Sequence, residues 1–138
     1  MILHWSFEEI TAASSGVERV LEGSGHGGVA APPRVIADIE ALRPRLTGDF
    51  TVDTLADARS ILRALDCILE EARFRTDRYI IEQHPAAESA VASFFDYAHL
   101  LTVQDRLRRM ESQMAALIEL MSGAPPTEQT ALSYQFPD

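Results

Sequence analysis

Carboxylates and a histidine near the middle of the chain are the first residues that could do chemistry. Asp96 and His99 stand three positions apart, so they would share one face of a helix. Carboxylate-bridged di-iron bundles use Glu-x-x-His pairs from two helices and a glutamate from each of the others. Acidic residues also occur on the neighbouring segments, at Glu70, Glu71, Glu82 and Glu88. The chain has no Glu-x-x-His and no second histidine at the right spacing, so we expect no metal and no other cofactor.

Arg78 and His84 form a second candidate pair near the expected junction of two helices. Their R-x5-H spacing resembles the R-x(4–6)-H signature of HEPN-type ribonucleases. The resemblance implies that Arg78 would bind or stabilise a phosphate, and that His84 would act in general acid–base catalysis of 2′-hydroxyl attack. It covers these two positions only. Tyr79 stands where that family usually has a polar residue, and Pro85 follows the histidine.

The composition describes an ordinary globular chain with a strong acidic balance. Its 138 residues are 46% hydrophobic and 24% charged, which favours one folded domain. The formal net charge is −9, and all 12 basic residues are arginine, which we attribute to a GC-rich bacterial genome. An excess of negative charge is unfavourable for binding nucleic acid or an anionic membrane, whereas it leaves protein partners open.

Cys67 is the only cysteine, so the chain has no internal disulfide and no thiolate metal cluster. We expect it to be a small, partly buried residue in a reducing compartment, most simply the cytoplasm. The apolar start of the chain lacks the basic and long apolar regions of a signal peptide. No uninterrupted apolar run approaches the roughly 18 residues of a membrane span.

Two long segments repeat apolar residues with alternating spacings of three and four, the heptad pattern of helices packed lengthwise. They predict an all-α fold with an antiparallel helical hairpin over about 54–83 and 86–122, and a turn at His84-Pro85. The first stripe consists of Leu55, Ala58, Leu62, Leu65, Leu69, Ala72, Thr76 and Tyr79. The second consists of Val103, Leu107, Met110, Met114, Leu117 and Met121.

Two shorter helices are expected before the hairpin. A capping box of Ser6 and Glu9 begins a helix over about 7–22, which Gly23 ends. Pro33 suits the first position of a second short helix, which Pro44 ends. We expect the Gly/Pro-rich stretch 23–33 to be a loop between them. These segments and the hairpin predict one helical-bundle domain over 1–122, followed by an extended tail over 123–138.

The second long helix carries another apolar stripe before its heptad stripe. Its members are Ala87, Val91, Phe94, Ala98 and Leu101, with Phe95 alongside. At 100° per residue the two stripes point roughly 165° apart, so the apolar face changes sides near Thr102. Either Thr102 caps a new helix there, or one continuous helix packs against different neighbours. We favour continuity, because no glycine, proline or asparagine marks a break.

The change of sides has a consequence for assembly. The straight stripe over 54–83 can cover only one side of the second helix. The remaining apolar stripe must be covered by the two N-terminal helices or by a second copy of the chain. Long hairpins commonly pair into four-helix bundles, so we expect a homodimer whose seam uses the heptad residues from Val103 to Met121.

Several charged residues are expected on solvated outer faces. Glu71 and Arg75 stand four apart in the favourable acid-before-base order. Three clustered arginines have acidic neighbours with which they can form surface ion pairs. The cluster consists of Arg106, Arg108 and Arg109, with Asp105 and Glu111.

In the tail, Leu132, Tyr134 and Phe136 alternate with polar residues after a proline-rich spacer. They suit docking on a partner, as an added strand or by insertion into pockets. The alternatives are that the tail folds back on the bundle or is disordered. The function that these patterns favour is non-catalytic. We expect an adaptor, accessory subunit or assembly factor that binds another, unidentified protein, with the HEPN-like ribonuclease as the alternative.

The two functions differ in what Arg78→Ala and His84→Ala should do. For an interaction module we expect neither substitution to change RNA cleavage or cell toxicity, because neither residue would touch a reacting group. The measurement is cleavage of a fluorescent RNA by the purified variants beside the unsubstituted chain. RNA cleavage by the unsubstituted chain that either substitution abolishes would establish the ribonuclease instead.

Overall fold

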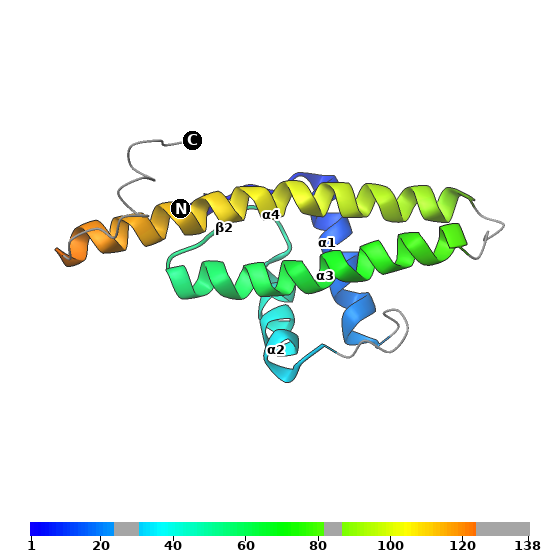
Figure 1. Cartoon of the computed structure of the whole chain (residues 1–138), viewed down its shortest axis with the longest axis horizontal. Coiled ribbons are helices and arrows are strands. Elements are labelled where there is room, and N and C mark those ends of the chain that lie inside the picture. Colours follow the sequence, from blue (N-terminus) through cyan, green and yellow to red (C-terminus); the bar gives the residue numbers. More distant parts are fainter. Residues whose placement is uncertain (24–30, 82–86, 124–138) are drawn as a thin grey trace.

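The structure is a computed structural model that describes residues 1–23, 31–81 and 87–123. The helices are α1 (Phe7–Leu21), α2 (Pro33–Leu42), α3 (Leu55–Ile81) and α4 (Ala87–Ser122), with a 3-10 turn η2 (Arg43–Arg45) after α2. Two short strands, β1 (Ile2–Leu3) and β2 (Phe50–Thr51), complete the described elements. α3 and α4 pack lengthwise as an antiparallel hairpin, which confirms the predicted all-α fold (Figure 1).

α4 is one continuous helix through Thr102, as the absence of a helix breaker predicts. The Thr102 hydroxyl donates to the carbonyl of Ala98 at 3.1 Å, one turn back, which is how a threonine behaves inside a helix. It therefore caps nothing. At its end, α4 extends past the first residue of α3 (Figure 1).

Local signals in the sequence fix the ends of α1. The Ser6 side chain accepts from the Glu9 backbone N–H at 3.1 Å, and Glu9 accepts from the Ser6 N–H at 2.7 Å. This is the predicted capping box. At the other end Gly23 has a φ of 69°, a conformation that favours glycine, and its N–H donates to the carbonyl of Val20.

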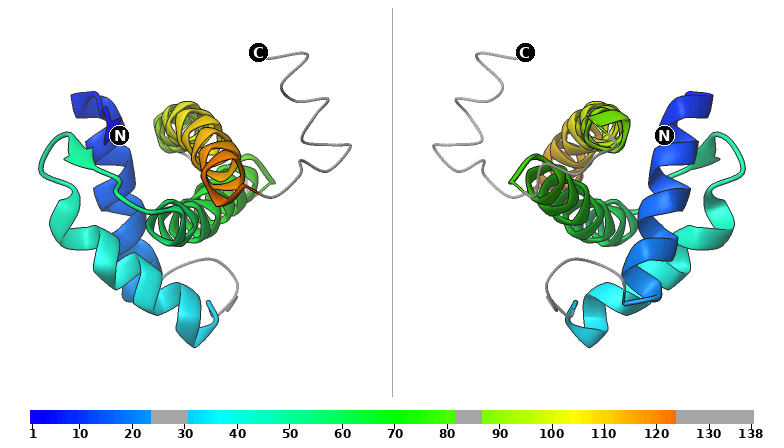
Figure 2. Two further views of the ribbon diagram at one scale, coloured as in Figure 1. Left: turned by 90° about the vertical axis from the view of Figure 1, so that its left-hand side faces the viewer. Right: turned by 90° about the vertical axis from the view of Figure 1, so that its right-hand side faces the viewer.

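α1 and α2 lie together on one side of the hairpin (Figure 2). α1 contacts both α3 and α4, whereas α2 packs on α3. All four helices contribute to one hydrophobic core. Its largest fully buried apolar side chains are Leu3, Val17, Ile39, Leu42, Val52, Leu65, Ile68, Leu100, Val103 and Leu107.

The small antiparallel sheet is a feature that the sequence did not indicate. Ile2 pairs with Thr51 and Leu3 with Phe50, and Val52 continues the pairing through its N–H to the carbonyl of Met1 at 2.7 Å. Two residues per strand are too few to show the alternation by which a strand is recognised. The pairing joins the N-terminus to the segment before α3, where Leu3 and Val52 are buried in the core.

Some sequence predictions fall outside the described residues. They are the loop over 24–30, His84 and Pro85 at the hairpin turn, and the tail over 124–138 with Leu132, Tyr134 and Phe136. Within the part of the chain that the structure describes, none of the helices is long and apolar enough to span a membrane.

At Gly16, α1 packs tightly against Ile68 of α3. A Cβ built on Gly16 would overlap the Cγ2 methyl of Ile68, which explains a glycine in the middle of a helix. We expect Gly16→Ala to lower the free energy of unfolding by about 1–3 kcal/mol through overpacking, despite the better helix propensity of alanine. Chemical denaturation followed by circular dichroism measures the change.

The matched control removes the methyl that Gly16→Ala would meet. In an Ile68→Ala background, Gly16→Ala should cost nothing or stabilise the chain, because the new Cβ then has space. An equal cost in both backgrounds would show that this contact does not determine the residue at position 16.

Candidate functional site

Glu9 joins α1 to α4 through a nearly buried ion pair. Its side chain is 3% exposed, and Arg106 reaches its two carboxylate oxygens at 2.6 and 2.9 Å. Burial alone would raise the pKa of Glu9, but the hydrogen bonds from Arg106 and Ser6 outweigh it and leave the pKa lowered. Arg106, predicted on a solvated face, therefore helps to fix α1 on the hairpin.

Asp38 fixes α2 in the same way. The guanidinium of Arg63 on α3 donates to Asp38 at 2.8 and 3.3 Å, and the Ser60 hydroxyl donates at 2.7 Å. The hydrogen bond from Arg63 is the main cause that lowers the pKa of Asp38, and Ser60 adds to it. Both N-terminal helices are thus held on the same side of the hairpin by a carboxylate and an arginine.

Glu71 and Arg75 do not lie on a solvated face, contrary to the sequence prediction. They are 5% and 8% exposed, because Arg19 of α1 and Asp96 of α4 both approach α3 at this point. Arg75 lies 3.3 Å from a Glu71 oxygen and 3.5 Å from an oxygen of Asp96 on α4. Three residues before Asp96, Ser93 is the buried residue within 90–96, and it is small and polar. This first part of α4, before the buried Leu100, therefore turns a polar face inward.

Four large apolar side chains of α4 between Val91 and Leu101 consequently face solvent. Phe94 is 56% exposed and Phe95 55%, and their rings meet edge to face with centroids 6.2 Å apart. Val91 and Leu101 are exposed as well. α1 and α2 cover none of the four. Among the described elements, none therefore covers these members of the apolar stripe predicted before Thr102. We call Val91, Phe94, Phe95 and Leu101 the apolar patch.

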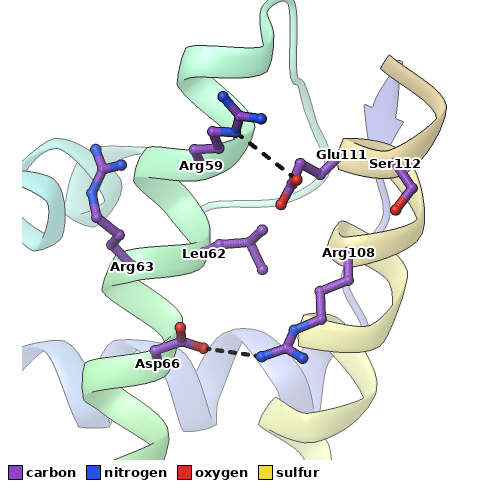
Figure 3. Close-up of a pocket in the computed structure, with 7 residues that line it drawn as sticks. All are labelled: Arg59, Leu62, Arg63, Asp66, Arg108, Glu111 and Ser112. Carbon is purple, nitrogen blue, oxygen red and sulfur yellow. Dashed lines mark ion pairs between the residues drawn. The ribbon is translucent and has the colours of Figure 1, made fainter. Parts of the chain in front are cut away.

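A cleft of about 470 Å³ lies between α3 and α4 (Figure 3). Two ion pairs bridge it, Arg59 with Glu111 and Arg108 with Asp66, each at 3.9 Å, and Leu62 points into the space between them. Arg63 points away from the cleft toward Asp38 (Figure 3). The exposed arginines and carboxylates suit recognition of another charged surface, and the described residues that line the cleft include no histidine or cysteine.

The cleft and part of the apolar patch lie on the same face of the hairpin. In a helix, residues seven apart lie almost one above the other. On α4, Leu101 and Phe94 precede Arg108 of the cleft in steps of seven. On α3, Arg73 and Ile80 follow Asp66 of the cleft in the same steps. We call the face formed by these residues and Arg59 the open face, since α1 and α2 lie on the other side of the hairpin (Figure 2).

The residues predicted as an oligomer seam are divided between two environments. Val103, Leu107 and Met114 are buried in the core of a single chain, and Met110 packs against it. Leu117 and Met121 are exposed, as are Ile118 and Leu120. These last four lie where α4 continues past α3, and we call them the overhang. Of the predicted seam residues, only Leu117 and Met121 are exposed to a second molecule.

The predicted catalytic and metal residues do not form a site in the described part of the chain. Arg78 is exposed in the last turn of α3, while its proposed partner His84 lies outside the described residues. Asp96 faces Arg75 instead of a metal-ligand set. Among the described residues, no group of three or more His, Cys, Asp or Glu side chains could hold a metal ion. The ribonuclease resemblance stays a prediction.

Cys67 is half-buried against the core, as predicted. Burial raises the pKa of its thiol, and the nearby carboxylates of Glu71 and Glu70 raise it further. The thiolate, which is the nucleophilic form, is therefore disfavoured at neutral pH. Comparison with known proteins adds no assignment, since no family model, curated protein or solved structure matches the chain.

The paired carboxylates predict an acid-sensitive fold. Glu9, Asp38 and Asp49 all have lowered pKa values in the folded chain, Asp49 through hydrogen bonds from the Trp5 N–H and from His4. Around pH 4 the unfolded chain takes up protons that the folded chain does not bind, so protonation favours unfolding. We expect the free energy of unfolding to be level from pH 7 to 5 and to fall below about pH 4.5.

Asp38→Asn provides the control for this pH dependence. The variant should be less stable at pH 7, because Arg63 loses its charged partner, and its stability should fall less steeply in acid. Urea unfolding at several pH values measures both effects. An acid dependence as steep as that of the unsubstituted chain would show that Asp38 does not contribute.

Proposed function

We propose that this chain is a non-catalytic protein–protein interaction module, working as an adaptor, an accessory subunit or an assembly factor. The exposed apolar surface of α4 carries the proposal. Of the thirteen exposed large hydrophobic side chains among the described residues, eight lie on α4, four in the apolar patch and four in the overhang. Single exposed apolar residues are common on folded proteins, whereas grouped ones are typical of interaction sites.

Charge supports a protein as the partner. The chain carries a net charge of −9, which is unfavourable for binding nucleic acid or an anionic membrane. A lone cysteine suits a reducing compartment, and basic residues that are all arginine suit a GC-rich bacterial genome, so the proposal includes a bacterial cytoplasm.

The overhang is the surface best placed for a different protein. It lies beyond the N-terminal end of α3, so its side chains can enter a partner's groove without displacing an element of the fold. It also adjoins the start of the tail in sequence. A partner that binds the overhang can therefore also receive Leu132, Tyr134 and Phe136 of the tail, in trans, as the alternation of these residues suggests.

Affinity capture with full-length variants tests this function. In a Leu117→Glu/Met121→Glu double variant we expect at least tenfold less of a specific partner to be recovered, because two apolar contacts of about 1.5–3 kcal/mol each are lost. Both residues are exposed, so the melting temperature should not change. The control is Phe7→Glu, which makes the same kind of substitution at an exposed residue of α1.

Deleting residues 124–138 separates the two roles of the tail. Loss of the partner with an unchanged melting temperature would assign the tail to docking, and a fall in stability would assign it to the bundle. If the unsubstituted chain enriches no protein, or if the overhang and Phe7 variants recover the same proteins in the same amounts, the proposed function is wrong.

A further inference from the structure

The open face is the other large surface of the hairpin, and its two ends differ in chemistry. Phe94, Leu101 and Ile80 lie toward the turn of the hairpin, and the bridged charges of the cleft lie toward the other end. We propose that a second copy of this chain covers the open face, with both hairpins parallel to a two-fold axis, as a four-helix bundle. The inference rests on the proposed function and names one of its partners.

The size of the open face matches what a stable dimer requires. The 27 residues of α3 span about 40 Å at 1.5 Å per residue, and two adjacent helices are about 20 Å wide. Such a face offers on the order of 800 Å² per copy, which is the share of one partner in a standard protein interface. The patch alone would be too small, so the charged end must take part.

Two symmetric arrangements would bring two open faces together. If the two-fold axis runs across the hairpins, they lie antiparallel, and Phe94 of one copy meets the charged cleft of the other. If the axis runs along the hairpins, both copies have the same direction, and the apolar ends meet each other. The second arrangement sets Phe94 against Ile80 of the other copy and leaves no charge desolvated against a phenyl ring. Arg73, which pairs with Glu70 of its own chain at 3.7 Å, then lies opposite Leu101 of the other copy.

Charge complementarity also favours the parallel arrangement. A two-fold axis along the hairpins places α3 of one copy opposite α4 of the other at the same height. Asp66 then faces Arg108 of the second copy, and Arg59 faces its Glu111, so both facing pairs of the cleft have opposite charges. Within one chain these pairs are loose, at 3.9 Å, and the side chains of Asp66 and Arg108 are more than half exposed. Asp66 also accepts a hydrogen bond from the Gln104 amide of its own chain, but both side chains keep exposed surface for pairing between copies.

A change at Phe94 provides the first test. The unsubstituted chain should be a dimer by size-exclusion chromatography with light scattering at micromolar concentration. Phe94→Glu should raise the dissociation constant at least tenfold and leave the melting curve of the monomer cooperative, since Phe94 already faces solvent. Phe7→Glu, on α1, should leave the dimer intact. A monomeric unsubstituted chain at about 100 μM, or a dimer insensitive to Phe94→Glu, would overturn the inference.

A charge exchange tests the orientation independently. Asp66→Arg alone and Arg108→Asp alone should each weaken the dimer, because like charges then face each other between two identical copies. Mixing the two variants should restore a heterodimer. Positions 66 and 108 are then both arginine in one copy and both aspartate in the other, so opposite charges face each other in both directions. Each variant should unfold much like the original chain, since exposed ion pairs contribute little to stability.

The outcomes separate this inference from the proposed function. Failure of the mixture to dimerise, while Phe94→Glu still abolishes the dimer, would overturn the parallel arrangement. A monomeric chain that loses its captured partner through the overhang variant would overturn self-association and leave the proposed function standing. A dimer that captures no other protein would overturn the proposed binding of a different protein and leave self-association standing.

Discussion

The ion pair of Glu71 with Arg75 on the inner surface of α3 determines how the rest of the hairpin is arranged. Both groups are nearly buried, and a buried charge without a partner would cost several kcal/mol. Asp96 supplies Arg75 with a second carboxylate from α4. Turning α4 to bury Phe94 would withdraw that carboxylate and leave the charges of α3 against a phenyl ring. The polar contact therefore keeps Phe94 and Phe95 on the outside.

Two further carboxylates decide which side of the hairpin is covered. Glu9 with Arg106 holds α1, and Asp38 with Arg63 holds α2. Each pair joins helices that are distant in sequence, and apolar packing of Ile39 and Val17 then fills the space around them. Apolar contacts supply most of the stabilisation, but they tolerate sliding and rotation, whereas a hydrogen-bonded ion pair has one geometry. The charged pairs thus specify the arrangement that the core stabilises.

Much of the fold was predictable because it depends on local patterns. The capping box at Ser6, the glycine at the end of α1 and the heptad spacing of α3 act within a few turns of chain, and the structure confirms them. The continuity of α4 followed from the absence of a breaker at Thr102. What periodicity could not show is which element lies opposite a given face.

The candidate site shows that limit most clearly. Glu71 and Arg75 have the spacing of a surface ion pair, and their burial follows only from the approach of α1 and α4. The cleft could not be predicted either, since Arg59 and Glu111 come from different helices and meet only through the register of the hairpin. The apolar patch itself was visible in the sequence. Whether another part of the chain covers it is a tertiary property, and α1 and α2 lie on the opposite side.

The two apolar stripes of α4 therefore have separate physical roles. Val103 and Leu107 lie on the side that faces the core, so their packing stabilises every folded chain. Phe94 and Leu101 lie on the other side of the same continuous helix, where they add nothing to the packing of one chain. An amphipathic helix that only had to complete a monomer would keep one face along its whole length. The change of sides near Thr102 is therefore what leaves Phe94 and Leu101 exposed on a helix whose other side completes the core.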